Sequence, residues 1–294
     1  MAHELWTSTL TGHRRRGTRL AEIRALFEDG ISAGAILELL KSCPADAPAE
    51  EMSRLLASHE FDAAGVKESP NTPLAQFVRR EDLEHGLVRD HSRPLTTDWL
   101  IADSTPLADV LKVLRDKAEV FVLIGPEVCG IVTRADVNKP PVRLYLFGLI
   151  SLLEMHLTYW IKEVYDGDSW KSALSPQRVS NAQRIQKRLR EKREDLELRT
   201  CLQLADKCEL VLASADACSI LGIRDVHQTR ELLESAVDLR HKLAHSDDDL
   251  TVGSSWKRIS DVVSEIERLL HQSDRVAEEK ASVGRSDLGH SDGN

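Results

Sequence analysis

The segment Arg240-His241-Lys242-Leu243-Ala244-His245 combines side chains that could bind and cut a phosphodiester. An imidazole can both accept and return a proton, so His245 has the side chain of a general acid or base. The guanidinium of Arg240 stays charged and can donate two hydrogen bonds to phosphate oxygens. Together these two groups could catalyse cleavage of a phosphate ester without a metal ion.

The position of this pair on a helix limits the chemistry. Apolar residues recur at three- and four-residue spacing over 226–245, which predicts a helix that ends before the acidic run 247–249. Five residues of helix correspond to about 140° of rotation, so Arg240 and His245 share a face only if the last turn unwinds or the arginine curls back. The alternative is structural, because cations near a helix C-terminus are favoured by the helix dipole.

The same periodicity predicts that the whole C-terminal half is helical. Its predicted helices span 142–164, 179–198, 199–214, 226–245 and 254–275, and an up-and-down bundle is the simplest arrangement for them. The first helix is nearly all apolar, but Glu154 and His156 interrupt it, which favours a core or interface helix over a membrane span. Glu154 would be costly to bury alone, so we expect Arg240 or His245 to be its partner.

The Arg240–His245 segment resembles the Arg-polar-x-x-x-His motif of HEPN domains, and the resemblance extends over 141–272 through the number and order of helices. It implies that His245 acts as general base or acid on a ribose 2′-hydroxyl and that Arg240 stabilises charge on the phosphate. It also implies that His241 orients the backbone or the phosphate. Glu154, as the expected partner of Arg240 or His245, completes the candidate catalytic set. The family implies a homodimer in which two motifs meet in a cleft, and a metal-independent ribonuclease.

A strand-and-helix pattern occurs twice in the N-terminal half, which indicates an internal duplication of about fifty residues. The first copy has a predicted helix at 50–57, strands at 62–66 and 74–78, and the ending Arg79-Arg80-Glu81-Asp82. The second has a helix at 107–114, strands at 120–124 and 128–132, and the ending Thr133-Arg134-Ala135-Asp136. A short helical pattern at 36–40 precedes both.

The second copy resembles a CBS motif through its Thr105-Pro106 helix start and the ending Gly130-Ile131-Val132-Thr133-Arg134-Ala135-Asp136. In that family the ending places a hydroxyl and a carboxylate on ribose and phosphate, and paired motifs commonly bind adenine nucleotides. The resemblance therefore implies that Gly130, Thr133 and Asp136 bind AMP, ADP or ATP as a regulatory ligand.

The first copy departs from this pattern. Its matching positions hold Gln76, Arg79 and Asp82, so the glycine and threonine are absent while the carboxylate remains, and Arg79 could pair with a phosphate instead. A structural alternative applies to the second copy as well, because Thr133 and Asp136 could simply cap the helix that follows.

Composition narrows the partners. The net charge of −9 disfavours a general nucleic-acid coat protein, and neither DNA nor a membrane is an expected partner. One basic run is either a solvated face or a track for an RNA backbone; it comprises Arg184, Lys187, Arg188, Arg190, Lys192 and Arg193. Five cysteines without a CxxC pair support neither a disulfide framework nor a zinc site, which points to a reducing cytoplasm.

The sequence thus predicts an α+β protein, with a tandem CBS module followed by an all-α HEPN-like bundle. The predicted boundaries are a disordered arm at 1–17, a CBS pair at 18–138 with copies at about 36–86 and 95–138, a bundle at 139–275 and a disordered tail at 276–294. The predicted function is a homodimeric, metal-independent endoribonuclease that needs no cofactor and is regulated by an adenine nucleotide. One alternative is a non-catalytic, nucleotide-sensing dimer that binds RNA or protein; another is a CBS pair that binds nothing.

Overall fold

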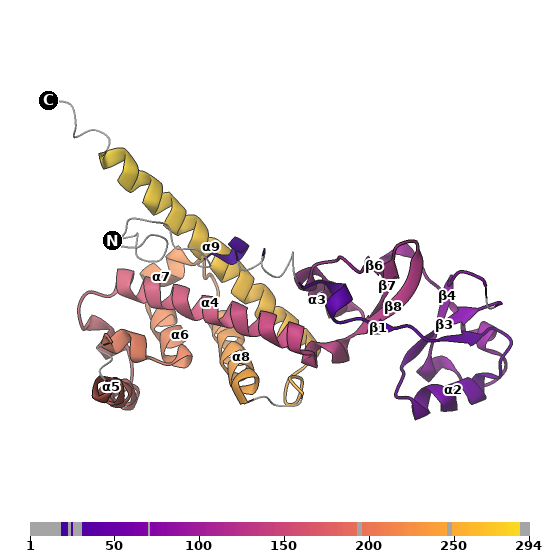
Figure 1. Ribbon diagram of the computed structural model, residues 1–294. Coiled ribbons are helices and arrows are strands. Elements are labelled where there is room, and N and C mark those ends of the chain that lie inside the picture. The colour runs from indigo at the N-terminus through magenta and orange to yellow at the C-terminus, as the bar shows by residue number, and fades with distance from the viewer. Residues whose placement is uncertain are drawn as a thin grey trace. The chain divides into compact units, whose positions relative to one another are not determined.

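A computed structural model describes residues 19–22, 25, 31–69, 71–192, 196–245 and 249–288, with the backbone alone over 281–288. The described residues fall into two units, one within Phe27–Val142 and the other within Arg143–Asn294 together with Met1–Leu26. The first unit is mixed α/β and the second is helical (Figure 1). The predicted arm at 1–17 lies outside the described residues.

The α/β unit contains the predicted duplication. The first copy consists of β2 (Ser42–Pro44), α2 (Ala49–Ser58), β3 (Ala63–Lys67) and β4 (Gln76–Arg79). The second consists of β6 (Leu100–Ala102), α3 (Leu107–Asp116), β7 (Glu119–Ile124) and β8 (Glu127–Thr133). In each copy the first strand pairs parallel with the second, and the second pairs antiparallel with the third. The two copies therefore have the same topology.

Each sheet is completed by a strand that precedes the other copy. β1 (Glu38–Leu39) comes before the first copy but pairs with β8, and β5 (Arg93–Pro94) comes before the second copy but pairs with β4. The resulting sheet orders are β1-β8-β7-β6 and β2-β3-β4-β5. The helix expected at 36–40 is wrong, because an isolated helix so short is not stable and the segment gains ladder hydrogen bonds to β8 instead.

Gly130 has a packing role in this exchange. It pairs with Leu39, and a Cβ atom added to it would lie 3.1 Å from Val122 and 3.2 Å from the Leu37 side chain. A larger residue there would need Val122 and the Leu37 side chain to shift by a few tenths of an ångström.

Aromatic side chains pack between the two copies. The ring of Phe77 on β4 lies 4.7 Å from that of Phe121 on β7 and 5.3 Å from that of Trp99, measured between centroids. Phe77 and Phe121 are completely buried, so this contact joins the two sheets. Val66 and Val78 of the first sheet pack in a separate core cluster.

Short 3-10 helices connect these elements. They are η1 (Ala33–Ala35), η2 (Arg80–Asp82), η3 (Val88–His91), η4 (Thr97–Trp99) and η5 (Arg134–Asn138). η2 and η5 occupy equivalent places, each directly after the last strand of its copy.

The helical unit contains α4 (Pro140–Val164) from Arg143 onward. It also contains η6 (Ser169–Ala173), α5 (Pro176–Glu191), η7 (Leu198–Cys201), α6 (Leu204–Ala213), α7 (Ala215–Ile220), α8 (Val226–His245) and α9 (Trp256–Leu288). The disordered tail predicted from residue 276 is wrong as far as Leu288, because α9 continues. Ala277 is buried and Arg275 pairs with Glu279 four residues on, two contacts that support helix beyond residue 275.

α4 is held against α9 by a buried polar cluster. The hydroxyl of Ser273 accepts a hydrogen bond from Trp160 Nε1 at 2.6 Å and lies 2.7 Å from His156 Nδ1. Nearer the start of α4, the Tyr145 hydroxyl donates to Glu267 at 2.9 Å. Tyr145 precedes Trp160 on α4, and their partners Glu267 and Ser273 follow the same order on α9, so the two helices run in the same direction.

Among the described residues, α4 is also long and apolar enough to cross a membrane by length and composition alone. However, 61% of its most apolar window is buried inside the protein. By itself this is a weak indication of a membrane span, and core helices commonly share it.

Candidate functional sites in the two units

A cleft of about 390 Å³ lies in the α/β unit where the last strands of the two copies end. Cross-strand pairing matches Ala63 to Arg79 in the first copy and Glu119 to Thr133 in the second. The next residues match too, because Arg80 N donates to Asp62 O at 2.8 Å and Arg134 N to Ala118 O at 3.1 Å. The cleft is therefore lined by equivalent positions of both copies: Asp62 and Ala118, Ala63 and Glu119, Arg79 and Thr133, Arg80 and Arg134, and Glu81 and Ala135, with Ile131 besides.

Two of the three cleft arginines already have carboxylate partners. Arg79 Nε lies 2.6 Å from Glu119 Oε1, and the Arg79 guanidinium also lies over the Trp99 ring. Arg80 pairs with Asp62 at 2.7 Å. Each ion pair neutralises one cation of the cleft.

Arg134 is held differently. Its guanidinium donates to the carbonyl oxygens of Leu114 at 3.0 Å and Arg115 at 3.1 Å. Carbonyl groups fix the guanidinium without cancelling its charge, and no carboxylate of the described residues forms an ion pair with it. Arg134 thus gives the cleft a fixed positive charge suited to phosphate.

Thr133 and Asp136 form the cap that the structural alternative predicts. Asp136 Oδ2 accepts from Thr133 N at 2.6 Å, and Thr133 Oγ1 lies 3.3 Å from the same oxygen. Asp136 is buried, and its other oxygen pairs with Lys139 Nζ at 2.6 Å. Thr133 lines the cleft, whereas neither Asp136 nor Gly130 does.

Asp82, the remaining predicted ligand residue, pairs with Arg93 at 2.6 Å and does not line the cleft. Of the five predicted nucleotide contacts, the structure brings only Arg79 and Thr133 together there. The sequence interpretation missed Arg80, Arg134 and Glu119 as cleft residues. Arg80 and Arg134 could have been found, because they follow Arg79 and Thr133 in the aligned endings of the two copies.

In the helical unit, α8 remains helical as far as His245, so its last turn does not unwind. Arg240, His241 and His245 are all exposed. His241 and His245 are four residues apart and share a face, whereas Arg240 is rotated about 140° away from His245. One chain alone does not present Arg240 and His245 on one helix face.

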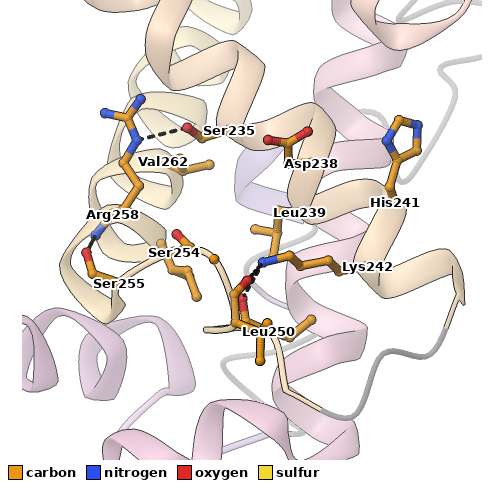
Figure 2. A pocket seen from close by; sticks show the side chains of 13 residues that line it. Ser235, Asp238, Leu239, His241, Lys242, Leu250, Ser254, Ser255, Arg258 and Val262 are labelled. Carbon is orange, nitrogen blue, oxygen red and sulfur yellow. Dashed lines mark hydrogen bonds between the residues drawn. The ribbon is translucent and has the colours of Figure 1, made fainter.

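A cavity of about 610 Å³ lies between the last turns of α8 and the start of α9 (Figure 2). Asp238 and His241 line it, but Arg240 and His245 do not. Lys242 Nζ donates to the carbonyl oxygens of Leu250 and Val252, which fastens the α8–α9 loop to α8.

The opposite wall of this cavity is fixed by Arg258 on α9. Its Nε donates to Ser235 Oγ at 2.8 Å and its Nη2 to Glu231 O at 2.7 Å, so the guanidinium reaches back to α8 (Figure 2).

Glu154 does not have the expected partner. Its Oε1 lies 2.8 Å from Lys207 Nζ on α6, and the lysine side chain is only 6% exposed. Lys207 is thus the counter-ion of Glu154, in place of Arg240 or His245. This ion pair gives Glu154 a structural role, because it joins α4 to α6. The sequence interpretation had instead assigned Glu154 to the catalytic set. Within the described residues, no group of three or more His, Cys, Asp and Glu side chains could hold a metal ion.

Comparison with known proteins finds similarity to solved structures alone. No protein-family model and no curated protein matches the sequence. The CBS-pair protein CBSX2 from Arabidopsis thaliana is 19% identical over 39% of this chain and 96% of its own, with a TM-score of 0.34. A structure of CBSX2 in complex with AMP gives 19% identity, 39% and 98% coverage and a TM-score of 0.35.

The CBS domain of a bacterial CNNM/CorC family Mg²⁺ transporter in complex with ATP is 17% identical, covering 40% of this chain and 92% of that one, with a TM-score of 0.33. At these identities and TM-scores, the likeness assigns neither a family nor an activity to the chain.

Proposed function

We propose that the α/β unit is a CBS pair that binds an adenine nucleotide in the cleft between its two copies. The observation that carries the proposal is that equivalent residues of both copies meet there and that three of them are arginines. The CBS resemblance supplies the adenine nucleotide as ligand class, and the fixed charge of Arg134 supplies a site for its phosphate.

The polar residues in and near the cleft then have distinct parts. The Thr133 hydroxyl and the Arg134 guanidinium contact the phosphate, and Arg79 joins them when Glu119 releases it. Asp136 holds Thr133 in place. Its carboxylate could contact a ribose only if it broke its hydrogen bond to Thr133 and its ion pair with Lys139. Asp82 acts at a distance, by fixing Arg93.

Calorimetry with AMP, ATP and S-adenosylmethionine tests this binding. We expect Arg134→Ala to weaken the affinity by about tenfold or more, since a charge-assisted contact is worth about 1.5 kcal/mol or more. Lys112→Ala, which removes an exposed cation from α3, is the matched control and should bind as the parent does. If none of the three compounds gives a binding signal, the CBS pair is a structural platform.

We further propose that the helical unit is HEPN-like and is a metal-independent endoribonuclease in which His245 transfers protons and Arg240 stabilises the phosphate. Both groups are exposed near the end of α8, where an RNA strand can reach them. Since they lie on different sides of one helix, a complete site needs a second copy of the chain. His241 shares a face with His245 and would orient the phosphate.

An exposed apolar pair on α4 supports such a homodimer. Leu144 and Phe147 are 58% and 44% exposed and lie three residues apart on the helix. Next to them, Arg143 Nη2 lies 3.4 Å from Lys242 O, so this patch is beside the last turns of α8. A second copy that covers Leu144 and Phe147 would therefore lie close to the Arg240 and His245 segment.

The decisive assay incubates single-stranded RNA with the protein and EDTA, with and without adenine nucleotides. Loss of a general acid or base lowers rates by about 10²–10⁴-fold, which is the effect we expect of His245→Ala. His227→Ala on the same helix, an exposed histidine, is the control, and Arg224→Ala is the control for Arg240→Ala.

A mixing experiment tests the two-copy site. Arg240→Ala and His245→Ala proteins, each inactive alone, should regain part of the activity after subunit exchange, because a mixed dimer has one site with both groups intact. If the mixture stays inactive while the parent cuts, the site lies within one chain.

The rival proposal is a non-catalytic, nucleotide-sensing dimer that binds RNA or a protein. The separation of Arg240 and His245 on α8 favours it, as does a cavity lined by neither. Intact RNA after incubation with the parent protein, together with measurable nucleotide binding, would establish the rival.

We also propose a route for regulation and a cytoplasmic location. Thr133 contacts Asp136, which pairs with Lys139, and α4 begins at the next residue. A nucleotide that moves Thr133 would therefore shift the position of the first turn of α4.

The proposed cytoplasmic location rests on α4. Most of the apolar window of α4 is buried inside the protein, which is compatible with a soluble protein.

A further inference from the structure

The outer face of α5 carries basic side chains that form no ion pair with any carboxylate of the described residues. Arg184, Lys187, Arg188 and Lys192 are exposed, and none forms an ion pair within the described part of the chain. Among the described residues, Arg184 alone of these four makes a side-chain hydrogen bond, to Asn181 Oδ1 at 3.2 Å. This is unusual in a chain of net charge −9, where acids outnumber bases by 48 to 39.

The contrast with Arg178, on the first turns of the same helix, shows that this is not simply a basic helix. Arg178 pairs with the buried Asp206 of α6 at 2.8 Å, which attaches α5 to the bundle. Gln186 adds a second attachment by donating to Leu196 O at 2.8 Å. The exposed cations therefore project from a helix that other residues hold in place.

Their spacing forms a continuous strip. Arg184, Arg188 and Lys192 follow each other at four-residue intervals, and Lys187 lies in the neighbouring row. At 1.5 Å per residue, the row extends over about 12 Å of helix. Glu191 is the only acidic residue on α5, so the strip keeps one sign of charge over most of this length.

We propose that this strip binds the phosphate backbone of single-stranded RNA. Guanidinium groups fork onto phosphate oxygens, and a row of cations in which Glu191 is the one acid attracts a polyanion regardless of sequence. The proposal rests on the proposed ribonuclease or RNA-binding function, to which it adds the surface that holds the substrate.

Two other occupants fit less well. A helix that lies on a membrane needs large apolar side chains on its outer face, but α5 turns Ala182 inward and has no large exposed hydrophobic residue among those described. A protein interface centres on buried aromatic or aliphatic anchors, which the strip also lacks.

The test measures binding of a fluorescent single-stranded RNA to full-length protein carrying His245→Ala, so that RNA is not cut. The variant Arg184→Ala, Lys187→Ala, Arg188→Ala should bind at least tenfold more weakly at low salt. The slope of log affinity against log salt should become shallower by about 2, because each phosphate contact on a single strand contributes about 0.7.

The matched control removes three exposed cations elsewhere: Arg54→Ala, Arg224→Ala and Lys257→Ala. It changes the net charge equally and should keep the affinity and salt slope of the parent. Parent-like binding by the α5 variant, or no RNA binding by the parent, overturns the proposal. So does binding of phosphatidylserine vesicles or polyglutamate through these residues without RNA binding.

Binding and cleavage give separate readouts. If the α5 variant no longer binds RNA and neither the parent nor any variant cleaves it, the RNA-binding role of the strip is supported and the proposed ribonuclease activity is wrong. If His245 is required for cleavage but the α5 variant binds RNA as the parent does, only the proposed RNA-binding role of the strip is wrong.

Discussion

Arg79 and Glu119 form an ion pair of 2.6 Å between the end of one copy and the start of the last hairpin of the other. The Glu119 side chain is only 9% exposed, so its carboxylate faces Arg79 rather than bulk water. Because both residues line the cleft, the carboxylate occupies the place that a phosphate would take on Arg79. Glu119 thus acts as an internal competitor of the proposed nucleotide.

Removing this competitor should improve binding. We expect Glu119→Gln to raise the affinity for AMP or ATP by about tenfold, as expected for about 1.4 kcal/mol of lost competition. Calorimetry measures the affinity, and Glu127→Gln at the exposed start of β8 is the control. Unchanged or weaker binding would show that Arg79 and Glu119 only join the two copies.

Breaking the Glu154–Lys207 pair should destabilise the bundle. Glu154→Gln leaves the buried Lys207 ammonium without its counter-ion, and such losses cost about 3–5 kcal/mol when the pair is well buried. Glu154 is 30% exposed, so a value at or below the lower end is expected. Denaturant unfolding measures the loss. Adding Lys207→Met should restore most of it, and a failure to do so would mean that Glu154 acts through another contact.

Asp274 should make stability depend on pH. Burial raises the pKa of the Asp274 carboxyl to about 6, and the nearby Glu278 charge raises it further. The hydrogen bond from Leu20 N at 2.9 Å and the charges of Arg19 and His271 act in the opposite direction and lower this pKa. A carboxyl whose pKa is raised on folding stabilises the fold at low pH, and this contribution is lost as pH rises through about 6.

Asp274→Asn should therefore raise the melting temperature at pH 7.5 or so, where the parent carries a buried charge, and the gain should shrink towards about pH 4. Asparagine keeps an oxygen for Leu20 N. Differential scanning fluorimetry across pH tests this, with Asp116→Asn at an exposed position as control. A gain that does not vary with pH would contradict the assignment.

Ser273 should be essential to the packing of α4 on α9. Ser273→Ala removes the hydroxyl that Trp160 Nε1 and His156 Nδ1 contact in a buried site, and a buried donor left unsatisfied costs about 1–3 kcal/mol. Ser264→Ala, on the exposed side of α9, should be close to neutral. Equal unfolding midpoints for the two variants would show that water replaces the lost hydroxyl.

The sequence predicted the elements whose side chains repeat over many residues. The helices at α2, α3, α4 and α8 and the strands β3, β7 and β8 lie where apolar periodicity indicates them. β1 and β5 have two residues each, too few for any period, and their place depends on pairing with distant strands. Helix α9 passes the predicted end because Ala277 is buried by tertiary contacts, which local polarity does not reveal.

The candidate sites were predictable to a similar extent. Aligning the two copies matched Arg79 to Thr133, and the ladders place both at equivalent positions. Which charges meet across the copies could not be read from the sequence, so Glu119 was missed. Likewise the partner of Glu154 depends on which helix packs beside it, and α6 brings Lys207 there.

The exchange of outer strands has a consequence for synthesis on the ribosome. Glu38 pairs with Ile131, so β1, the earliest strand among the described residues, has no partner until almost the whole α/β unit has been translated. Long-range pairing of this kind is slow to form and leaves unpaired backbone groups exposed in the meantime. A gene split between the two copies should yield two aggregation-prone fragments, which regain a soluble fold only when they are produced together.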